Sequence, residues 1–234
     1  MSNFPGFPPE TQAFLRELRE NNTREWFAAN KERFDDVVRA PALQWVAAMG
    51  ERLKTLDADI VIDLRVNGSG SLMRAARDTR FSKDKSPYKV NVAMMWWRGA
   101  GKKMQHPAFG MQITPDDAGL MAGMFHFRKP MLEAYRQAVV DDELGEKLLE
   151  ATRTVEDAGY SISGRHYKTV PRGFDKEHPR VEWLKYNNLH AGAHDIAPGI
   201  IASPQLIDVS FDHFAKLAPI HHWLAAVQKR FGGV

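Results

Sequence analysis

The stretch VNVAMMWWRGAGKKMQHPAFGMQITPDDAGLMAGMFHF, residues 90–127, decides the fold. It contains three runs rich in apolar residues, at 90–98, 108–114 and 120–127, and short connections separate them. Because short connections suit neighbouring antiparallel strands, the stretch predicts an antiparallel sheet in the middle of the chain. The first run is apolar without alternation, which indicates a strand buried on both faces.

Amphipathic helices are expected on both sides of this strand cluster. Apolar residues at helical spacing predict helices over 11–20, 22–38 and 41–56. The same spacing predicts later helices over 130–140, 143–155, 178–186, 210–216 and 219–231, with a short β segment in 160–171. Because helices and strands are segregated along the chain, the class is α+β: a middle antiparallel sheet packed against N- and C-terminal helices. With no repeat or linker in view, we expect a single domain over residues 1–234.

Residues that begin or end helices and strands give more detailed expectations about the bounds of these elements. We expect a strand over 60–66, before a loop of small residues. Asn22 is expected to cap the second helix, with Glu25 as its capping-box partner. Pro219 is expected in the first turn of the last helix, where proline is tolerated.

The composition is that of an ordinary globular protein and excludes several kinds of site. Apolar residues make up 44% of the 234 residues, enough to form a sizeable core. The absence of cysteine excludes disulfides, zinc–thiolate sites and thiol nucleophiles. No signal-peptide pattern and no membrane-length apolar run is found, so we expect a soluble, cytoplasmic protein. A net charge of +3 permits an anionic partner without requiring one.

The segment MRAARDTRFSKDKSPYK, residues 73–89, is unusually basic. Its six cations are Arg74, Arg77, Arg80, Lys83, Lys85 and Lys89, and they face only Asp78 and Asp84. The three arginines recur every third residue, which on a helical turn places them on one side. Guanidinium groups beside hydroxyls and turn amides are typical of sites for phosphate or carboxylate.

This segment supplies the candidate site. The predicted ligand contacts are Arg77, Arg80, Lys83, Lys85, Tyr88 and Lys89, and the secondary candidates are Arg74, Asp78, His166, Lys168 and Arg172. Neighbouring arginines are expected to lower the pKa of Asp78 and keep it ionised. His166 is the only acid–base candidate, and its basic stretch at 164–186 would complete a positive cleft if it folds over the first segment.

The motif RDTRFSKDKSPYK at 77–89 resembles the signature of a bacterial and fungal family of conserved proteins of unknown function. Stretches at 14–27, 109–125 and 170–186 resemble the same family. The resemblance covers most of the chain and implies one full-length domain, but no activity, substrate or catalytic residue. Residues 124–126, Met-Phe-His, depart from the segment richer in glycine and tyrosine that the family leads one to expect.

Other constellations are weaker. His190 and His194 have a metal-ligand spacing, but Gly192 between them favours an ordinary loop. His213, His221 and His222 are expected to be structural or exposed, since consecutive histidines diverge on a helix. The small-residue loop at 68–71 lacks a P-loop lysine and is either a plain connection or a close approach for phosphate.

Three functions remain open from the sequence. The first is a binding or enzymatic site for a small phosphate- or carboxylate-bearing ligand. The second is an interaction module without chemistry, in which Arg77 and Arg80 pair with carboxylates of the protein itself. The third, nucleic-acid binding, is disfavoured by the small net charge and would show a steep salt dependence. No residue pattern identifies a cofactor, and none favours a metal.

Overall fold

The computed structural model describes residues 4–233, and its architecture is α+β. Five strands form an antiparallel sheet in the order β1-β2-β3-β5-β4. Their bounds are β1 (Val92–Trp97), β2 (Ala108–Ile113), β3 (Ala118–Met124), β4 (Ile162–Arg165) and β5 (Tyr186–Ile196). The first three strands confirm the strand cluster expected from residues 90–127, and β1 is buried almost throughout.

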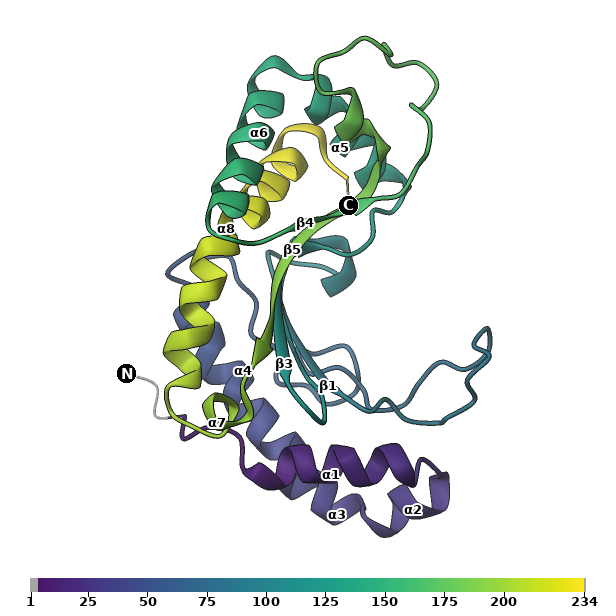
Figure 1. The fold of residues 1–234 in the computed structure, drawn as a ribbon, viewed down its shortest axis with the longest axis vertical. Coiled ribbons are helices and arrows are strands. Elements are labelled where there is room, and N and C mark those ends of the chain that lie inside the picture. The colour runs from purple at the N-terminus through teal and green to yellow at the C-terminus, as the bar shows by residue number, and fades with distance from the viewer. Residues whose placement is uncertain (1–3, 234) are drawn as a thin grey trace. The chain divides into compact units, whose positions relative to one another are not determined.

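Helices precede and follow the strand cluster, as expected (Figure 1). The α-helices are α1 (Pro9–Glu20), α2 (Arg24–Ala29), α3 (Lys31–Phe34), α4 (Ala40–Leu53), α5 (Lys129–Val140), α6 (Asp142–Asp157), α7 (Pro198–Ile201) and α8 (Leu206–Phe231). A π-helical turn, η1 (Asp35–Arg39), joins α3 to α4, and the 3₁₀ turns are η2 (Lys103–Gln105) and η3 (Val181–Lys185). In the described part of the chain, no helix has the length and apolar character that crossing a membrane requires.

The chain divides into two compact units by its internal contacts. Unit 1 comprises the described residues up to Trp96 together with Gly110–Leu120 and His194–Asp212. Unit 2 comprises Trp97–Phe109, Met121–Ala193 and the described residues from His213 onward. Strands β1, β2, β3 and β5 and helix α8 therefore contribute residues to both units.

An aromatic cluster around α4 forms the core of unit 1. Trp45 is fully buried on α4, and the rings of Phe4 and Phe7 lie 5.0 and 6.1 Å from it. Trp96 of β1 donates its indole N–H to the carbonyl of Val46 at 2.9 Å. The strand is thereby fixed to the helix by a buried hydrogen bond as well as by apolar packing.

The core of unit 2 centres on Tyr135 of α5. Its ring packs against Phe127 and Trp223 at 4.9 and 5.6 Å, and its hydroxyl donates to the carbonyl of Trp183 at 2.9 Å. Because the side chain is completely enclosed, burial raises the pKa of Tyr135 well above its ordinary value. The tyrosine is a packing residue with one satisfied polar end.

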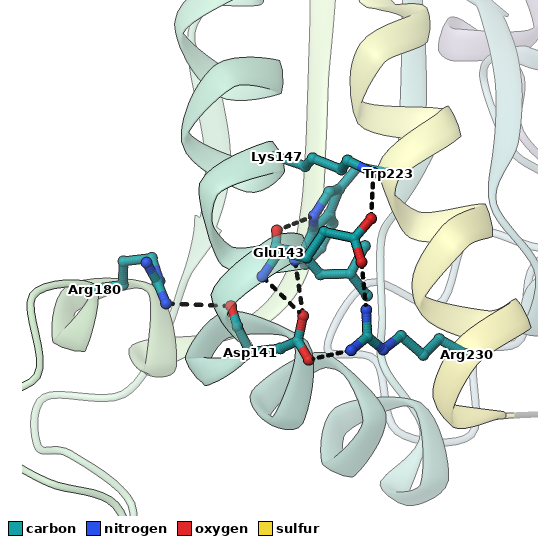
Figure 2. A network of polar contacts seen from close by, with 7 residues as sticks. Asp141, Glu143, Lys147, Arg180, Trp223 and Arg230 are labelled. Carbon is teal, nitrogen blue, oxygen red and sulfur yellow. Dashed lines mark hydrogen bonds and ion pairs between the residues drawn. The ribbon is translucent and has the colours of Figure 1, made fainter.

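A polar network ties α5, α6 and α8 together in unit 2 (Figure 2). Asp141 caps α6 by accepting from the amides of Glu143 and Leu144, and its other oxygen pairs with Arg230 at 2.7 Å. Trp223 of α8 donates its indole N–H to the carbonyl of Leu144 at 2.8 Å. The buried Arg180 donates to the carbonyl of Asp141 at 3.2 Å.

The structure corrects two of the finer expectations near the N-terminus. Residues 61–70 form a loop, where a strand over 60–66 was expected. Gly70 makes this possible, because a Cβ there would lie 2.1 Å from the carbonyl oxygen of Arg65. Thr23, not Asn22, caps α2, and its hydroxyl accepts from the amide of Trp26 at 3.2 Å.

Further corrections concern the second half of the chain. Pro219 lies inside one continuous helix, α8, which replaces the two helices expected over 210–216 and 219–231. The HAGAHD stretch belongs to β5 and is not a loop. Only the 3₁₀ turn η3 forms where a helix over 178–186 was expected. In β5 and α8, contacts with neighbouring elements outweigh a local glycine or proline signal.

Candidate functional site

The basic segment is an extended hairpin and not the helical turn that the arginine spacing predicted. Ala76 pairs with Tyr88 in an antiparallel bridge, and the amide of Arg77 donates to the carbonyl of Pro87 at 2.9 Å. The amide of Lys89 donates to the carbonyl of Ala75 at 2.8 Å. We call residues 72–77 and 87–94 the stem of this basic hairpin and residues 78–86 its tip; Figure 1 shows it as a long loop leading into β1.

The extended backbone separates the arginines. Side chains alternate along such a chain, so positions 74, 76, 78 and 80 are exposed while the positions between them are partly buried. Arg77 therefore points to the opposite face from Arg74 and Arg80. The three guanidinium groups do not converge on one point, as a helical turn would have required.

Ion pairs with carboxylates of the tip occupy two of the predicted ligand contacts, Arg77 and Arg80. Arg80 binds the carboxylate of Asp78 through two hydrogen bonds of 3.0 and 2.7 Å. This pairing, with the amide of Arg80, lowers the pKa of Asp78 to about 2, and the predicted ionised state of Asp78 is confirmed in direction. Arg77 pairs with Asp84. The pKa of Asp84 is lowered to about 2, first by hydrogen bonds from the hydroxyl and amide of Ser86 and then by Arg77.

Two lysines and a phenylalanine of the tip face solvent. Lys83 is exposed, and Lys85 donates to the carbonyl of Thr79 at 3.0 Å. Phe81 is 95% exposed, and the guanidinium of Arg80 lies 5.8 Å from its ring centroid. The tip is therefore a solvated surface.

The stem is anchored to the start of unit 1 through Tyr88. Asn22 donates its side-chain amide to the carbonyl of Tyr88 at 3.0 Å and accepts from the amide of Tyr88 at 3.1 Å. The ring of Tyr88 stacks on Phe27 of α2 at 4.0 Å. Sequence reasoning assigned Asn22 to a helix cap and missed this role, because the two residues are 66 positions apart.

A cavity of about 220 Å³ lies between this stem and the first helices of unit 1. Its wall is mostly apolar. The apolar lining includes Leu15 and Leu18 of α1, Phe27 of α2, Phe34 of α3, and Leu72, Met73 and Val92 of the hairpin. Its charged side chains are Arg39, Arg74 and Lys89, and it brings together three of the sequence candidates, Arg74, Tyr88 and Lys89.

Among the described residues, two of these three cations form no ion pair with a carboxylate, although the charge of Arg74 also acts on Asp78 and helps to lower its pKa. Arg39 pairs with Asp35 at 2.6 Å. Within residues 4–233, no carboxylate forms an ion pair with Arg74 or Lys89. Burial lowers the pKa of Lys89, and the charge of Arg74 lowers it further. The partly buried ammonium thus lies close to a like charge, without a counter-ion.

The π-helical turn η1 contributes to the same cavity. It supplies Val38 and Arg39 to the wall, and the guanidinium of Arg39 lies 5.3 Å from the Phe34 ring centroid. Single π-helical turns inside α-helices are frequent at functional sites. Nothing in the sequence marked this turn, because its residues fit an ordinary amphipathic helix.

The second basic stretch lies in unit 2, whereas the basic hairpin lies in unit 1. His166, Lys168 and Arg172 are exposed, and the amide of His166 donates to the carbonyl of Lys185 at 2.9 Å. A cleft shared by the two basic stretches stays a prediction, as does an acid–base role for His166.

The histidines have structural surroundings. His221 is buried and stacks on Phe109 at 4.4 Å, and His213 shares a hydrogen bond of 2.7 Å with the hydroxyl of Tyr160. His190 and His194 are both on β5, where a separation of four residues spans about 13 Å. Among the described residues, no three histidine or acidic side chains gather as a metal site requires.

The chain belongs to the family described as conserved hypothetical protein (DUF2461), whose model matches residues 10–223. This match confirms the resemblance to a conserved family of unknown function. The matched residues include parts of both units and the whole basic hairpin. A comparison with curated proteins gave no match.

Proposed function

We propose that this protein binds a small anionic ligand in the cavity of unit 1, with Arg74 and Lys89 holding the anion. The single observation that carries the proposal is that Arg74 and Lys89 lie on a mostly apolar wall without an ion-pair partner among the described residues. Keeping a partly buried ammonium charged beside a guanidinium costs free energy, and a bound anion would remove that cost.

The proposal narrows the set of ligand contacts expected from the sequence. Tyr88 and Lys89 remain proposed ligand contacts, and Arg74 becomes a principal contact instead of a secondary candidate. Arg77 and Arg80 are assigned a structural role, because each already binds a carboxylate of the tip. For Arg77 and Arg80, the ion pairs within the protein that the interaction-module alternative expected explain the arginines better than ligand binding does.

The test is ligand-dependent thermal stability. Inorganic phosphate, acetate and benzoate are titrated while the melting temperature is recorded, and calorimetry gives the dissociation constant. At least one anion should raise the melting temperature of the wild type. Lys89→Ala and Arg74→Ala should each weaken its binding by about 10- to 100-fold, as expected for a lost hydrogen bond to a charged group.

Lys83→Ala is the matched control. It removes the same charge from the same segment, but Lys83 does not line the cavity. Binding should change by no more than about twofold, the effect of an exposed charge. The proposal fails if no anion raises the melting temperature, or if Lys83→Ala weakens binding as much as Lys89→Ala.

The exposed Phe81 favours one alternative, nucleic-acid binding at the tip. An aromatic ring between cations can stack with an unpaired base. In that case a single-stranded oligonucleotide would bind with an affinity that falls steeply with salt, and Phe81→Ala would weaken it. Lys89→Ala would leave this binding unchanged, which separates the two functions.

A further inference from the structure

We infer that the ligand of this cavity is an amphipathic monoanion, an acyl or aryl carboxylate of about six to ten carbons. The inference rests on the proposed function and adds the chemistry of the rest of the ligand. It follows from three features of the cavity: its apolar wall, its size and the small number of its charged groups.

The wall determines what the body of the ligand must be. The side chains of Phe34 and Leu72 on this wall are almost completely buried, and that of Leu15 is 1% exposed. A sugar or a nucleobase would lose its hydrogen bonds to water against these side chains and gain few in return. A hydrocarbon chain or ring gains from the same contact, because it removes apolar surface from water.

The size of the cavity sets the length of the ligand. About 220 Å³ exceeds the roughly 150 Å³ in which an apolar cavity takes up benzene. It therefore accommodates a ring or a medium chain, with the acidic group left at the cationic side.

The charges set the head group. Arg74 is exposed at the rim, and Lys89 is partly buried. The third cation, Arg39, is already paired with Asp35 and adds little to the binding of a second anion. The charge of Arg74 also acts on the carboxylate of Asp78, so the two cations together offer less than two full positive charges to a ligand. They therefore match a single carboxylate better than a phosphate monoester with a charge near −2.

The experiment is a chain-length series on the full chain. Calorimetry measures the binding of acetate, butanoate, hexanoate, octanoate and decanoate. Octanol is the uncharged control, and inorganic phosphate tests the alternative head group. Affinity should rise about fourfold per methylene up to about eight carbons and then level off as the cavity fills. Octanol and phosphate should each bind at least tenfold more weakly than octanoate.

Two variants assign the binding to this cavity. Lys89→Ala and Arg74→Gln should each weaken octanoate by at least tenfold, and circular dichroism shows whether each variant keeps its fold. If acetate and phosphate bind through Lys89 with no gain along the series, the inference fails and the proposed function stands. If no anion binds, or if octanol binds as well as octanoate, both fail.

Discussion

At the scale of single residues, Lys89 differs from the other cations of the basic hairpin by its burial. Its pKa lies below the ordinary value because of that burial and the nearby charge of Arg74. The folded protein therefore binds fewer protons than the unfolded chain between the lowered and the ordinary lysine pKa. By linkage, this group destabilises the folded state below the lowered pKa, and the penalty fades as the pH rises toward the ordinary value.

The replacement Lys89→Met should accordingly stabilise the ligand-free protein at pH values below the lowered pKa of Lys89, where the full penalty applies. The gain over wild type should shrink as the pH rises toward about 10, where the lysine loses its proton in both states. Urea titrations at several pH values measure the free energy of unfolding of both proteins. Lys83→Met is the control, because its side chain lies outside the cavity. A gain that is constant with pH would contradict the assigned cause.

The sequence could predict which residue types line the candidate site, but not which of them lie together. Six cations in seventeen residues indicated an anion site, and the ionised Asp78 was predicted correctly in direction. Whether Arg77 or Arg74 lines the cavity depends on whether the segment is helical or extended. That was decided by pairing with residues 87–94, which a local period of three does not reveal.

At the scale of elements, Arg180 connects the end of α5 to α6. Its buried guanidinium donates to the carbonyl of Val139 at 2.7 Å and pairs with Glu146 at 2.6 Å. The network of Figure 2 continues this connection to α8 through Asp141. Because helix ends leave carbonyls without partners, the arginine satisfies groups that would otherwise be buried unpaired.

Gly145 makes room for this arginine, and its replacement by alanine should destabilise the protein. A Cβ at this position would lie 2.3 Å from Nε of Arg180. We expect Gly145→Ala to lower the free energy of unfolding by about 1–3 kcal/mol, the effect of disturbing a buried hydrogen-bonded group. The usual effect of glycine to alanine in a helix has the opposite sign. Denaturant titration measures the difference.

Gly199→Ala is the matched control for this prediction. Gly199 lies in α7, and a Cβ there would meet nothing within 4 Å. The change should be neutral or stabilising by up to about 1 kcal/mol, through the lower entropy of the unfolded chain. Equal effects of the two replacements would show that Arg180 does not depend on the space at Gly145.

Elements were predictable where local signals and packing agree. Helices α1, α5 and α6 lie within two residues of their expected bounds, since each has a clear apolar stripe. Strand β5 was missed because Gly192 and the histidines weaken its local signal, while its pairing with two neighbouring strands holds it in place. Helix α8 continues through Pro219 because buried Leu217, Ile220 and Trp223 flank the proline.

At the scale of the whole molecule, the question is whether the two units are separate domains. The chain crosses from one unit to the other inside β1, β2, β3, β5 and α8, without a linker at these points. Domain boundaries normally fall in exposed, flexible segments that few contacts cross. The family match over residues 10–223 also includes parts of both units. We therefore propose that the single domain expected from the sequence is one cooperative folding unit.

Calorimetry should then show one unfolding transition for the entire chain. For 234 residues we expect an enthalpy of about 160 kcal/mol near 60 °C, equal to the van't Hoff enthalpy. Gly145→Ala in unit 2 and Asn22→Ala in unit 1 should each move this one transition to lower temperature. Asn22→Ala acts by removing both hydrogen bonds to the backbone of Tyr88. If each variant instead shifts only one of two resolved transitions, the units fold independently, and ligand binding in unit 1 would stabilise that unit alone.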